Sequence, residues 1–170
     1  FHAERPNQKW VTDISYILTP GGTLYLSTIR DLYDQSIVAY KTALRQDYAL
    51  VGRTIKAAME TESPQERVIL HSDQGGQYRS FDYQHEMKEA ALTPSMSNPG
   101  TPGDNAMAEN FFSIFKTECI YLEKPKTPQE AERLTSEFID YYNCDRLQLR
   151  TGMTPYQMRR NWFDAHIAQA

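Results

Sequence analysis

The amino-acid sequence predicts an α/β domain built on a mixed β-sheet. The first 43 residues hold three segments rich in β-branched and aromatic residues, whereas helical patterns fill most of the chain after residue 105. Between these regions, helical patterns alternate with short apolar runs, which is typical of a sheet that also contains parallel strands. A chain of 170 residues is long enough for one domain with a substantial core.

Three strands are expected near the start of the chain. Their segments are Trp10–Ile17, Thr23–Asp31 and Ser36–Ala43. A Thr-Pro-Gly-Gly sequence at 19–22 separates the first two and is a strong turn signal. Connections this short join antiparallel neighbours, so the three strands should form a meander.

The middle of the chain should alternate helices with strands. Val68–His71 begins with three apolar residues, as buried parallel strands do. The other expected elements are a helix at Asp47–Thr61, a helix at Ser80–Leu92 and a short strand at Thr93–Ser97.

The last third of the chain should be helical after one loop. The sequence NPGTPGDN at 98–105 is rich in glycine and proline, so it predicts a loop. Three helices are expected after it, at Asn105–Leu122, Pro128–Tyr142 and Pro155–Ile167. They would be appended to the sheet rather than inserted between its strands.

Composition and charge narrow the function only a little. The chain is 40% hydrophobic and 24% charged, as ordinary globular proteins are. Its net charge of −4 does not by itself favour a nucleic-acid binder. The charge is uneven, however: residues 145–170 hold four arginines against two aspartates, so they carry +2 and leave −6 for the remainder.

Membrane and zinc proteins are disfavoured. No run of 18 apolar residues and no signal peptide is visible. Cys119 and Cys144 lack the CxxC spacing of zinc sites, and two separated free thiols suit a reducing cytoplasm. Because the chain starts at Phe1 rather than methionine, we expect it to be part of a longer protein.

Three carboxylates are candidate site residues, although each has an ordinary alternative. Asp13 lies within the first strand, where aspartate is disfavoured, but it could sit on an exposed face or cap the strand. Asp73 follows the buried strand and could be a turn residue beside two glycines. Glu109 lies in the helix after the loop and could face solvent. His71 is more readily explained as a structural hydrogen-bonding group than as a ligand.

Taken together, the three acids favour a metal site over these alternatives. They come from a first strand, the end of a fourth strand and a helix after a loop, and such elements can meet at one edge of a mixed sheet. Carboxylate oxygens select hard divalent ions such as Mg²⁺ or Mn²⁺. Paired ions of this kind catalyse in-line phosphoryl transfer.

The sequence resembles the DDE transposases of bacterial insertion sequences, of the OrfB type, whose catalytic core is similar to that of retroviral integrases. Thirty-five residues separate Asp73 from Glu109, which is the interval of that family, and Lys116 matches its basic residue seven positions after the glutamate. The matching segments, in chain order, are PNQKWVTDISYI, YLSTIRDLYDQSIVAY, HSDQGGQYRS, SMSNPGTPGDNAMAENFFSIFKTE and YYNCDRLQLRTGMTP.

This resemblance implies an RNase H-like fold with a mixed five-stranded sheet, its first three strands antiparallel, flanked by helices with extra helices at the C-terminus. Residues 1–145 would be the catalytic core and 146–170 a helical extension of the same domain. Asp13, Asp73 and Glu109 would be the catalytic residues and would bind Mg²⁺ or Mn²⁺, in a pair.

The resemblance also implies a reaction and partners. The activity would be hydrolysis of a phosphodiester at the end of the element, followed by attack of the freed 3′-OH on target DNA. The partners would be the DNA at the ends of the insertion sequence, the target DNA and, in the full-length protein, further copies of the chain. The protein would be located in the bacterial cytoplasm. We expect DNA contacts from Lys116, Arg146, His71 and Asn105, and the other basic groups visible near the end of the chain are Arg150, Arg159 and Arg160, so few phosphates can be neutralised. For Arg146, bracing the last helices is an equal alternative.

Two alternatives to a transposase remain at this point. One is an RNase H-type nuclease, with the same metals and only water as the nucleophile. The other is a non-catalytic module for DNA binding or oligomerisation, in which the acids are structural. The sequence also departs from the family: Gln148 stands where a histidine is usual, and Gln35-Ser36 replaces a common Ser-Arg. Neither departure touches the three acids.

Overall fold

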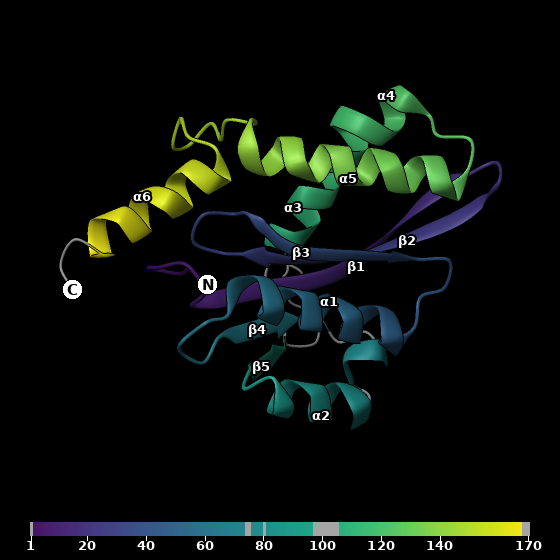
Figure 1. The fold of residues 1–170 in the computed structure, drawn as a ribbon. Coiled ribbons are helices and arrows are strands. Elements are labelled where there is room, and N and C mark those ends of the chain that lie inside the picture. The colour runs from purple at the N-terminus through teal and green to yellow at the C-terminus, as the bar shows by residue number, and fades with distance from the viewer. Residues whose placement is uncertain (1, 74–75, 80, 97–105, 168–170) are drawn as a thin grey trace.

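A computed structural model describes residues 2–73, 76–79, 81–96 and 106–167. A five-stranded sheet with the order β3-β2-β1-β4-β5 forms its centre (Figure 1). Its strands are β1 (Lys9–Thr19), β2 (Gly22–Asp31), β3 (Ile37–Ala43), β4 (Ile69–Ser72) and β5 (Thr93–Met96). The first three are antiparallel neighbours, and β4 runs parallel to both β1 and β5. The predicted mixed sheet with an antiparallel meander is therefore confirmed.

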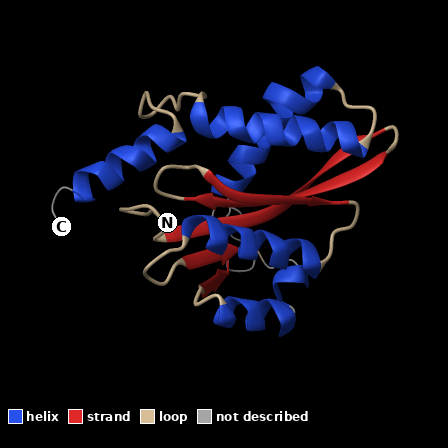
Figure 2. Ribbon diagram, in the orientation of Figure 1, coloured by secondary structure: helices blue, strands red, loops and turns tan. Residues whose placement is uncertain are grey.

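Helices cover both faces of the sheet (Figure 2). The helices are α1 (Tyr48–Glu62), α2 (Phe81–Glu89), α3 (Ala106–Phe115), α4 (Tyr121–Glu123), α5 (Pro128–Cys144) and α6 (Pro155–Ile167). A 3₁₀ turn, η1 (Gly76–Arg79), and a π-helical segment, η3 (Lys116–Ile120), complete the described elements. None of the helices in these ranges is long and apolar enough to cross a membrane.

Two apolar cores lie on opposite faces of the sheet. One joins α1 and α2 to the sheet through residues such as Trp10 and Ile55. The other joins α3, η3 and α5 through residues such as Ile17, Phe111 and Phe138. The alternation of side chains along a strand sends residues of opposite faces into different cores, so Trp10 of β1 packs in the first core and Ile17 in the second.

The helix expected at 105–122 is interrupted. α3 ends at Phe115, and the five residues of η3 are π-helical before α4 continues the chain. The π segment changes the helical register, so Ile120 is buried while Leu122 is 70% exposed. A uniform helical period therefore assigns Leu122 to the wrong side.

Candidate active site

The parallel pairing of β1 with β4 brings two of the predicted acids to the same edge. In this pairing Val11 is opposite His71, and it is the last pair of β1 with β4. Asp13 and Asp73 each stand two residues beyond that pair, and Asp73 directly follows the end of β4. Because side chains two residues apart in a strand share a face, the register places both carboxylates beyond the same end of the paired strands.

The third acid is brought to this edge by α3. Ala108, in the first turn of the helix, packs in one apolar cluster with Val11, which lies two residues before Asp13 on the same face of β1. Glu109 follows Ala108 directly and is exposed. The start of α3 therefore rests beside the acid of β1.

Arg30 fixes the first turn of α3 from the sheet. Its guanidinium is buried and donates a hydrogen bond to the carbonyl oxygen of Met107, two residues before Glu109. It also donates to the hydroxyl of Tyr142 at 2.7 Å and to Oε1 of Gln35 at 3.0 Å. Gln35, one of the departures from the family pattern, thus supports a positioning arginine that the sequence did not reveal as such.

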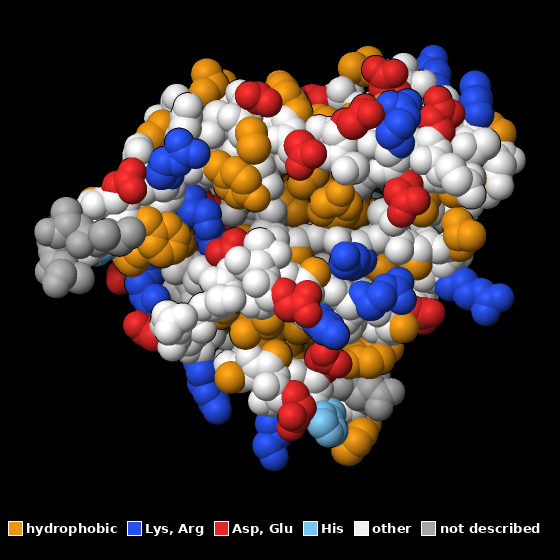
Figure 3. Space-filling view, viewed as in Figure 1, with side chains coloured by type: hydrophobic (Ala, Val, Ile, Leu, Met, Phe, Trp, Pro, Cys, Tyr) orange, Lys and Arg blue, Asp and Glu red, His pale blue; other side chains and the backbone are white. Residues whose placement is uncertain are grey.

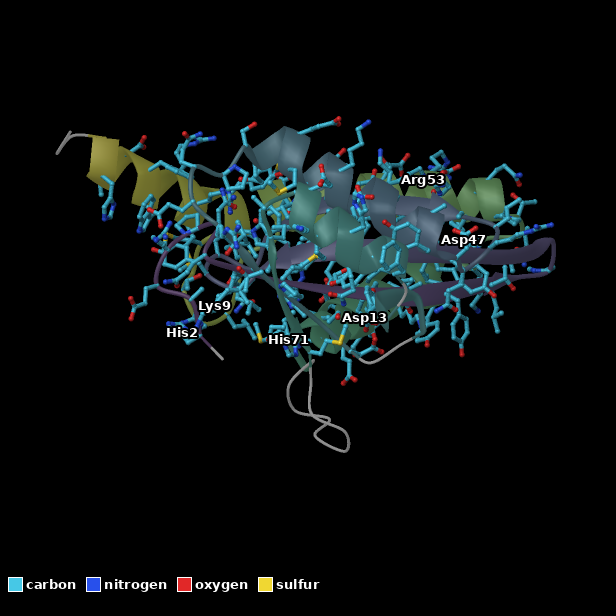
Figure 4. All side chains as sticks on the ribbon, turned by 90° about the horizontal axis from the view of Figure 1, so that it is seen from below. His2, Lys9, Asp13, Asp47, Arg53 and His71 are labelled. Atoms are coloured by element: carbon cyan, nitrogen blue, oxygen red, sulfur yellow. The ribbon has the colours of Figure 1, made fainter. Side chains whose placement is uncertain are left out.

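Electrostatics links the three acids. Burial raises the pKa of Asp13 to about 6, a hydrogen bond from the Ile14 amide at 2.8 Å opposes the shift, and the charges of Asp73 and Glu109 add to it. Figure 4 shows the Asp13 side chain on the sheet, near His71. The carboxylate of Asp13 is thus poorly solvated and surrounded by like charge, an environment that a cation would stabilise.

The donor set suits a hard divalent cation, because all three groups offer carboxylate oxygen. Within the described residues, however, no three Asp, Glu, His or Cys side chains already stand close enough together to hold a metal ion. The arrangement therefore brings the acids into one electrostatic neighbourhood without gathering them into a closed ligand shell.

Lys116 lies at the start of η3, seven residues after Glu109. Its ammonium group is 5.0 Å from the centre of the Tyr16 ring, a cation–π distance. Partial burial lowers the pKa of this lysine from its ordinary value. The side chain of Lys116 therefore lies next to Tyr16, in the part of β1 that follows Asp13.

Two of the other residues predicted to contact DNA form contacts within the protein instead. The buried ring of His71 lies with Nδ1 3.0 Å from the Ser95 hydroxyl, which matches the structural alternative. Arg146 donates two hydrogen bonds to Glu118, at 2.6 and 2.8 Å, and its guanidinium lies over the Tyr142 ring. Arg146 thus braces the helices in this structure, and its contact with DNA stays a prediction. Asn105 lies outside the described residues.

Arg159 is buried, so counting it among the groups that neutralise phosphates is wrong. Its guanidinium is buried and forms ion pairs with Asp31 at 3.2 Å, with Asp34 at 2.6 Å and with Glu62. Burial alone would lower its pKa, but the charges of Asp34, Glu62 and Asp31 outweigh that effect and raise it. No local pattern marks this cluster, because its members are distant in the sequence.

Gln148 has a structural position in the C-terminal motif. It is buried, and its Nε2 donates a hydrogen bond to the carbonyl oxygen of Asp34 at 2.6 Å. Its backbone carbonyl accepts from Thr151 and Gly152, which closes the turn before α6. The side chain therefore ties this turn to the connection between β2 and β3, next to the cluster around Arg159.

Replacing Asp13 with asparagine should stabilise the metal-free protein. Asparagine keeps the acceptor for the Ile14 amide but removes the buried charge. The folded pKa of about 6 lies above the ordinary 3.8, so the ionised side chain destabilises the fold above pH 6, by up to about 3 kcal/mol. Melting temperatures should therefore favour Asp13→Asn at pH 8 and converge with the wild type as the pH falls through 6 towards 4.

Manganese should reverse this order. The ion should bind the folded wild type and raise its melting temperature, whereas Asp13→Asn should respond weakly because it lacks one ligand charge. Equal responses of the two proteins to Mn²⁺ at pH 8 would remove Asp13 from the candidate site.

Comparison with known proteins places this geometry in context. Two family models described as "Integrase core domain" match residues 3–102 and 109–163. The chain is 38% identical over 164 residues to the InsK protein of insertion sequence element IS150 from Escherichia coli K12, covering 96% of this chain and 58% of InsK. It is 38% identical over 148 residues to the transposase of IS904 from Lactococcus lactis, covering 86% of this chain and 58% of that transposase.

A solved structure agrees with the fold. The dimeric form of the HTLV-2 integrase catalytic core domain, in complex with magnesium, superimposes with a TM-score of 0.69 over 92% of this chain and 98% of that one, at 16% identity. The RNase H-like fold expected from the sequence is therefore confirmed.

Proposed function

Since the chain belongs to the integrase core domain family of insertion-sequence transposases, we propose that it is the catalytic core that cuts and joins DNA strands during transposition. The chain spans 58% of the length of the relatives named above, so the activity of the whole protein is part of this proposal. One observation carries it: Asp13 and Asp73 stand at matching positions beyond the last parallel pair of β1 and β4.

The proposed cofactor is Mg²⁺ or Mn²⁺, bound as two ions by Asp13, Asp73 and Glu109. Support comes from the oxygen donor set, from the raised pKa of Asp13 and from the magnesium bound to the HTLV-2 integrase core. When bound, the metal would supply an activated oxygen nucleophile and neutralise charge on the leaving group. Closing the ligand shell would require the acids to draw together around the ions.

The side chains of the protein would then position the substrate strand. The three carboxylates are acceptors only, so they repel a phosphate until their charge is neutralised. Lys116 would contact a phosphate near the scissile bond, as a point charge that reads no base. Arg30 would act indirectly, because its hydrogen bond to Met107 fixes the first turn of α3 and thereby the position of Glu109 relative to β1.

The face of the molecule that carries α1, α2 and α5 offers little to DNA. Figure 3 shows acidic and basic side chains interspersed on the visible face, over α1, α2 and α5, instead of a stripe of one sign. The loss of Arg159 from the exposed basic groups reduces the charge available for phosphates further. We therefore propose that this core binds DNA weakly by itself, on the order of 10⁻⁴–10⁻⁶ M at physiological salt, and without sequence preference.

Three wider features of the full-length protein also remain proposals. We propose that it forms homo-oligomers, which agrees with the dimeric form of the HTLV-2 integrase core. Residues 146–170 would be an extension of the same domain, because Arg159 of α6 bonds to side chains of the sheet and of α1. We place the protein in the bacterial cytoplasm, where its DNA substrates are.

A strand-transfer assay tests the proposal. A labelled duplex that ends in a recessed 3′-OH should be joined to a second duplex in the presence of Mn²⁺, because the same acids would serve both chemical steps. Labelled products longer than the labelled strand on a denaturing gel are the expected result, because each consists of that strand and part of a target strand. Hydrolysis without joined products would indicate a nuclease of the RNase H type, and neither product would point to a non-catalytic module.

A further inference from the structure

A pocket of about 670 Å³ lies beyond the acids along β1. It is formed between the later half of β1, the π segment η3 and the connection that leads from α4 to α5. The residues that line it are Tyr16, Ile17, Leu18, Pro20, Lys116, Ile120, Tyr121, Lys124, Pro125 and Lys126. Its volume is within the range of about 300–1,000 Å³ that holds small organic ligands.

The charge of this pocket has one sign. Its lining holds three lysines, at 116, 124 and 126, and no carboxylate among the described residues. None of the three forms an ion pair within the part of the chain that the structure describes. In a chain with a net charge of −4, this is a local site for an anion.

The opposite side of the same helical segment provides a contrast. A second pocket there is lined by Glu118, Glu123 and Glu137 together with apolar residues, and by no lysine or arginine. Two of these glutamates are paired with arginines, Glu118 with Arg146 and Glu137 with Arg133, so this side has no excess of positive charge. A phosphate-bearing strand would therefore be attracted to the side that holds the lysines.

Exposed aromatic rings accompany the lysines. Tyr16 is 54% exposed and Tyr121 is 62% exposed, and both line the basic pocket. A ring left in water next to positive charge is the arrangement by which proteins bind single strands, in which a base stacks on the ring and lysines contact the backbone. Bases in an intact duplex do not offer their faces, so the ligand must be unpaired.

The π segment contributes to this arrangement. A π-helical turn holds more residues than an α-helical turn, and such turns recur at functional sites. Here the turn begins at Lys116 and ends at Ile120, both of which line the pocket. It follows α3 directly, so the pocket is connected to the helix that carries Glu109.

The distance between the three acids and the pocket agrees with a single DNA strand that passes from one to the other. Tyr16 is three residues from Asp13, or about 10 Å along a strand. Lys116 is seven residues from Glu109, or about 10 Å along a helix. A strand stacked as in a duplex rises 3.4 Å per nucleotide, so this span corresponds to at most about three nucleotides, and to fewer where an unpaired strand is extended.

We propose that this pocket binds an unpaired nucleotide of the substrate strand, within about three nucleotides of the phosphodiester that is cut. Its base stacks on Tyr121, because the ring of Tyr16 already faces the ammonium group of Lys116, and its phosphates contact Lys124 and Lys126. This inference rests on the proposed function and adds to it the requirement that the DNA be locally single-stranded beside the active site.

Fluorescence anisotropy tests the pocket without cleavage. The probes are a labelled 12-nucleotide oligothymidylate and a chain of the same length with abasic sugars throughout, both in Ca²⁺ to neutralise the acids without chemistry. The protein should bind the thymidylate about fivefold to a hundredfold more tightly, which is the effect of a stacked aromatic residue. Tyr121→Ala should abolish this preference, and Tyr121→Phe should keep it.

The lysines should act differently. Replacing both Lys124 and Lys126 with alanine should weaken binding of the two probes equally and lower the slope of log K against log salt by about 1.4. Tyr141→Ala and Lys56→Ala are matched controls, because both residues are exposed and lie outside the pocket, and they should change neither quantity.

Equal affinity of the wild type for both probes, or equal effects of Tyr121→Ala and Tyr141→Ala, would overturn the pocket assignment. Strand transfer with duplex DNA, measured on the same preparations, separates this failure from a failure of the proposed function. If the joined product forms while the probes bind equally, only the pocket is wrong.

Discussion

A Glu109→Gln protein should fold normally and lose metal-dependent cleavage of DNA by about a hundredfold or more. Glutamine has nearly the same size and helix propensity as glutamate, and the side chain is exposed in the first turn of α3, so folding has little to lose. The substitution removes one of three charges that would position the metal, and such electrostatic contributions dominate catalysis of this kind. Nicking of a supercoiled plasmid in Mg²⁺ measures the loss.

Glu123→Gln is the matched control for this result. Glu123 is an exposed glutamate in α4, further along the same run of helical segments and outside the acid cluster. It should nick at the rate of the wild type, and both variants should have nearly unchanged melting temperatures. Unimpaired Mg²⁺-dependent nicking by purified Glu109→Gln would remove this residue from the proposed active site.

An Arg159→Ala protein should be destabilised by about 3–5 kcal/mol, because removal of one partner leaves buried charges uncompensated. Asp31 and Asp34 are fully buried and Glu62 is largely so, and the guanidinium pairs with all three. The loss is a large share of the ~5–15 kcal/mol by which a domain is stable. Urea denaturation followed by circular dichroism measures it.

Arg160→Ala is the control, because Arg160 is the exposed neighbour in the same helix and should change stability by less than about 0.5 kcal/mol. Lowering the pH should reduce the difference in the free energy of unfolding between Arg159→Ala and the wild type. Burial and the nearby charge of Asp34 raise the pKa of Asp31 to about 6, so this carboxylate becomes neutral as the pH falls through that value. Similar unfolding midpoints for the two variants at pH 8 would show that the network adds no stability.

Much of the fold could be predicted because local sequence patterns determine it. The short turn at 19–22 implies antiparallel neighbours, and the apolar start of β4 implies a strand buried on both faces. The π segment could not be predicted in this way. Lys116 to Ile120 have ordinary helical composition, and their geometry depends on how Phe115 and Ile120 pack against α5 and the sheet.

The site was less accessible to sequence reasoning. The pattern identified Asp13, Asp73 and Glu109 as candidates, but it could not supply the register that pairs Val11 with His71, because pairing between distant strands is a tertiary property. For Arg146 the sequence did not decide between contact with DNA and bracing of the helices, because its partner Glu118 lies 28 residues away. Arg159 was counted among the basic groups available to phosphates for the same reason: nothing near it in the sequence reveals that it contacts Asp31.

The Arg159 cluster also sets the order in which a growing chain can fold. Arg159 lies 97 residues after Glu62 and 152 residues after Asn7, both of which it contacts. At the ~5–20 residues per second of protein synthesis, Glu62 waits roughly 5 to 20 seconds on the ribosome before its counter-ion is made, and Asp31 and Asp34 wait longer. A sheet that closed around these acids during that interval would carry the same uncompensated charges as Arg159→Ala, so its closure would be less favourable until Arg159 is made. The acidic centre of the nascent chain should therefore gain its full stability only after α6 has been synthesised.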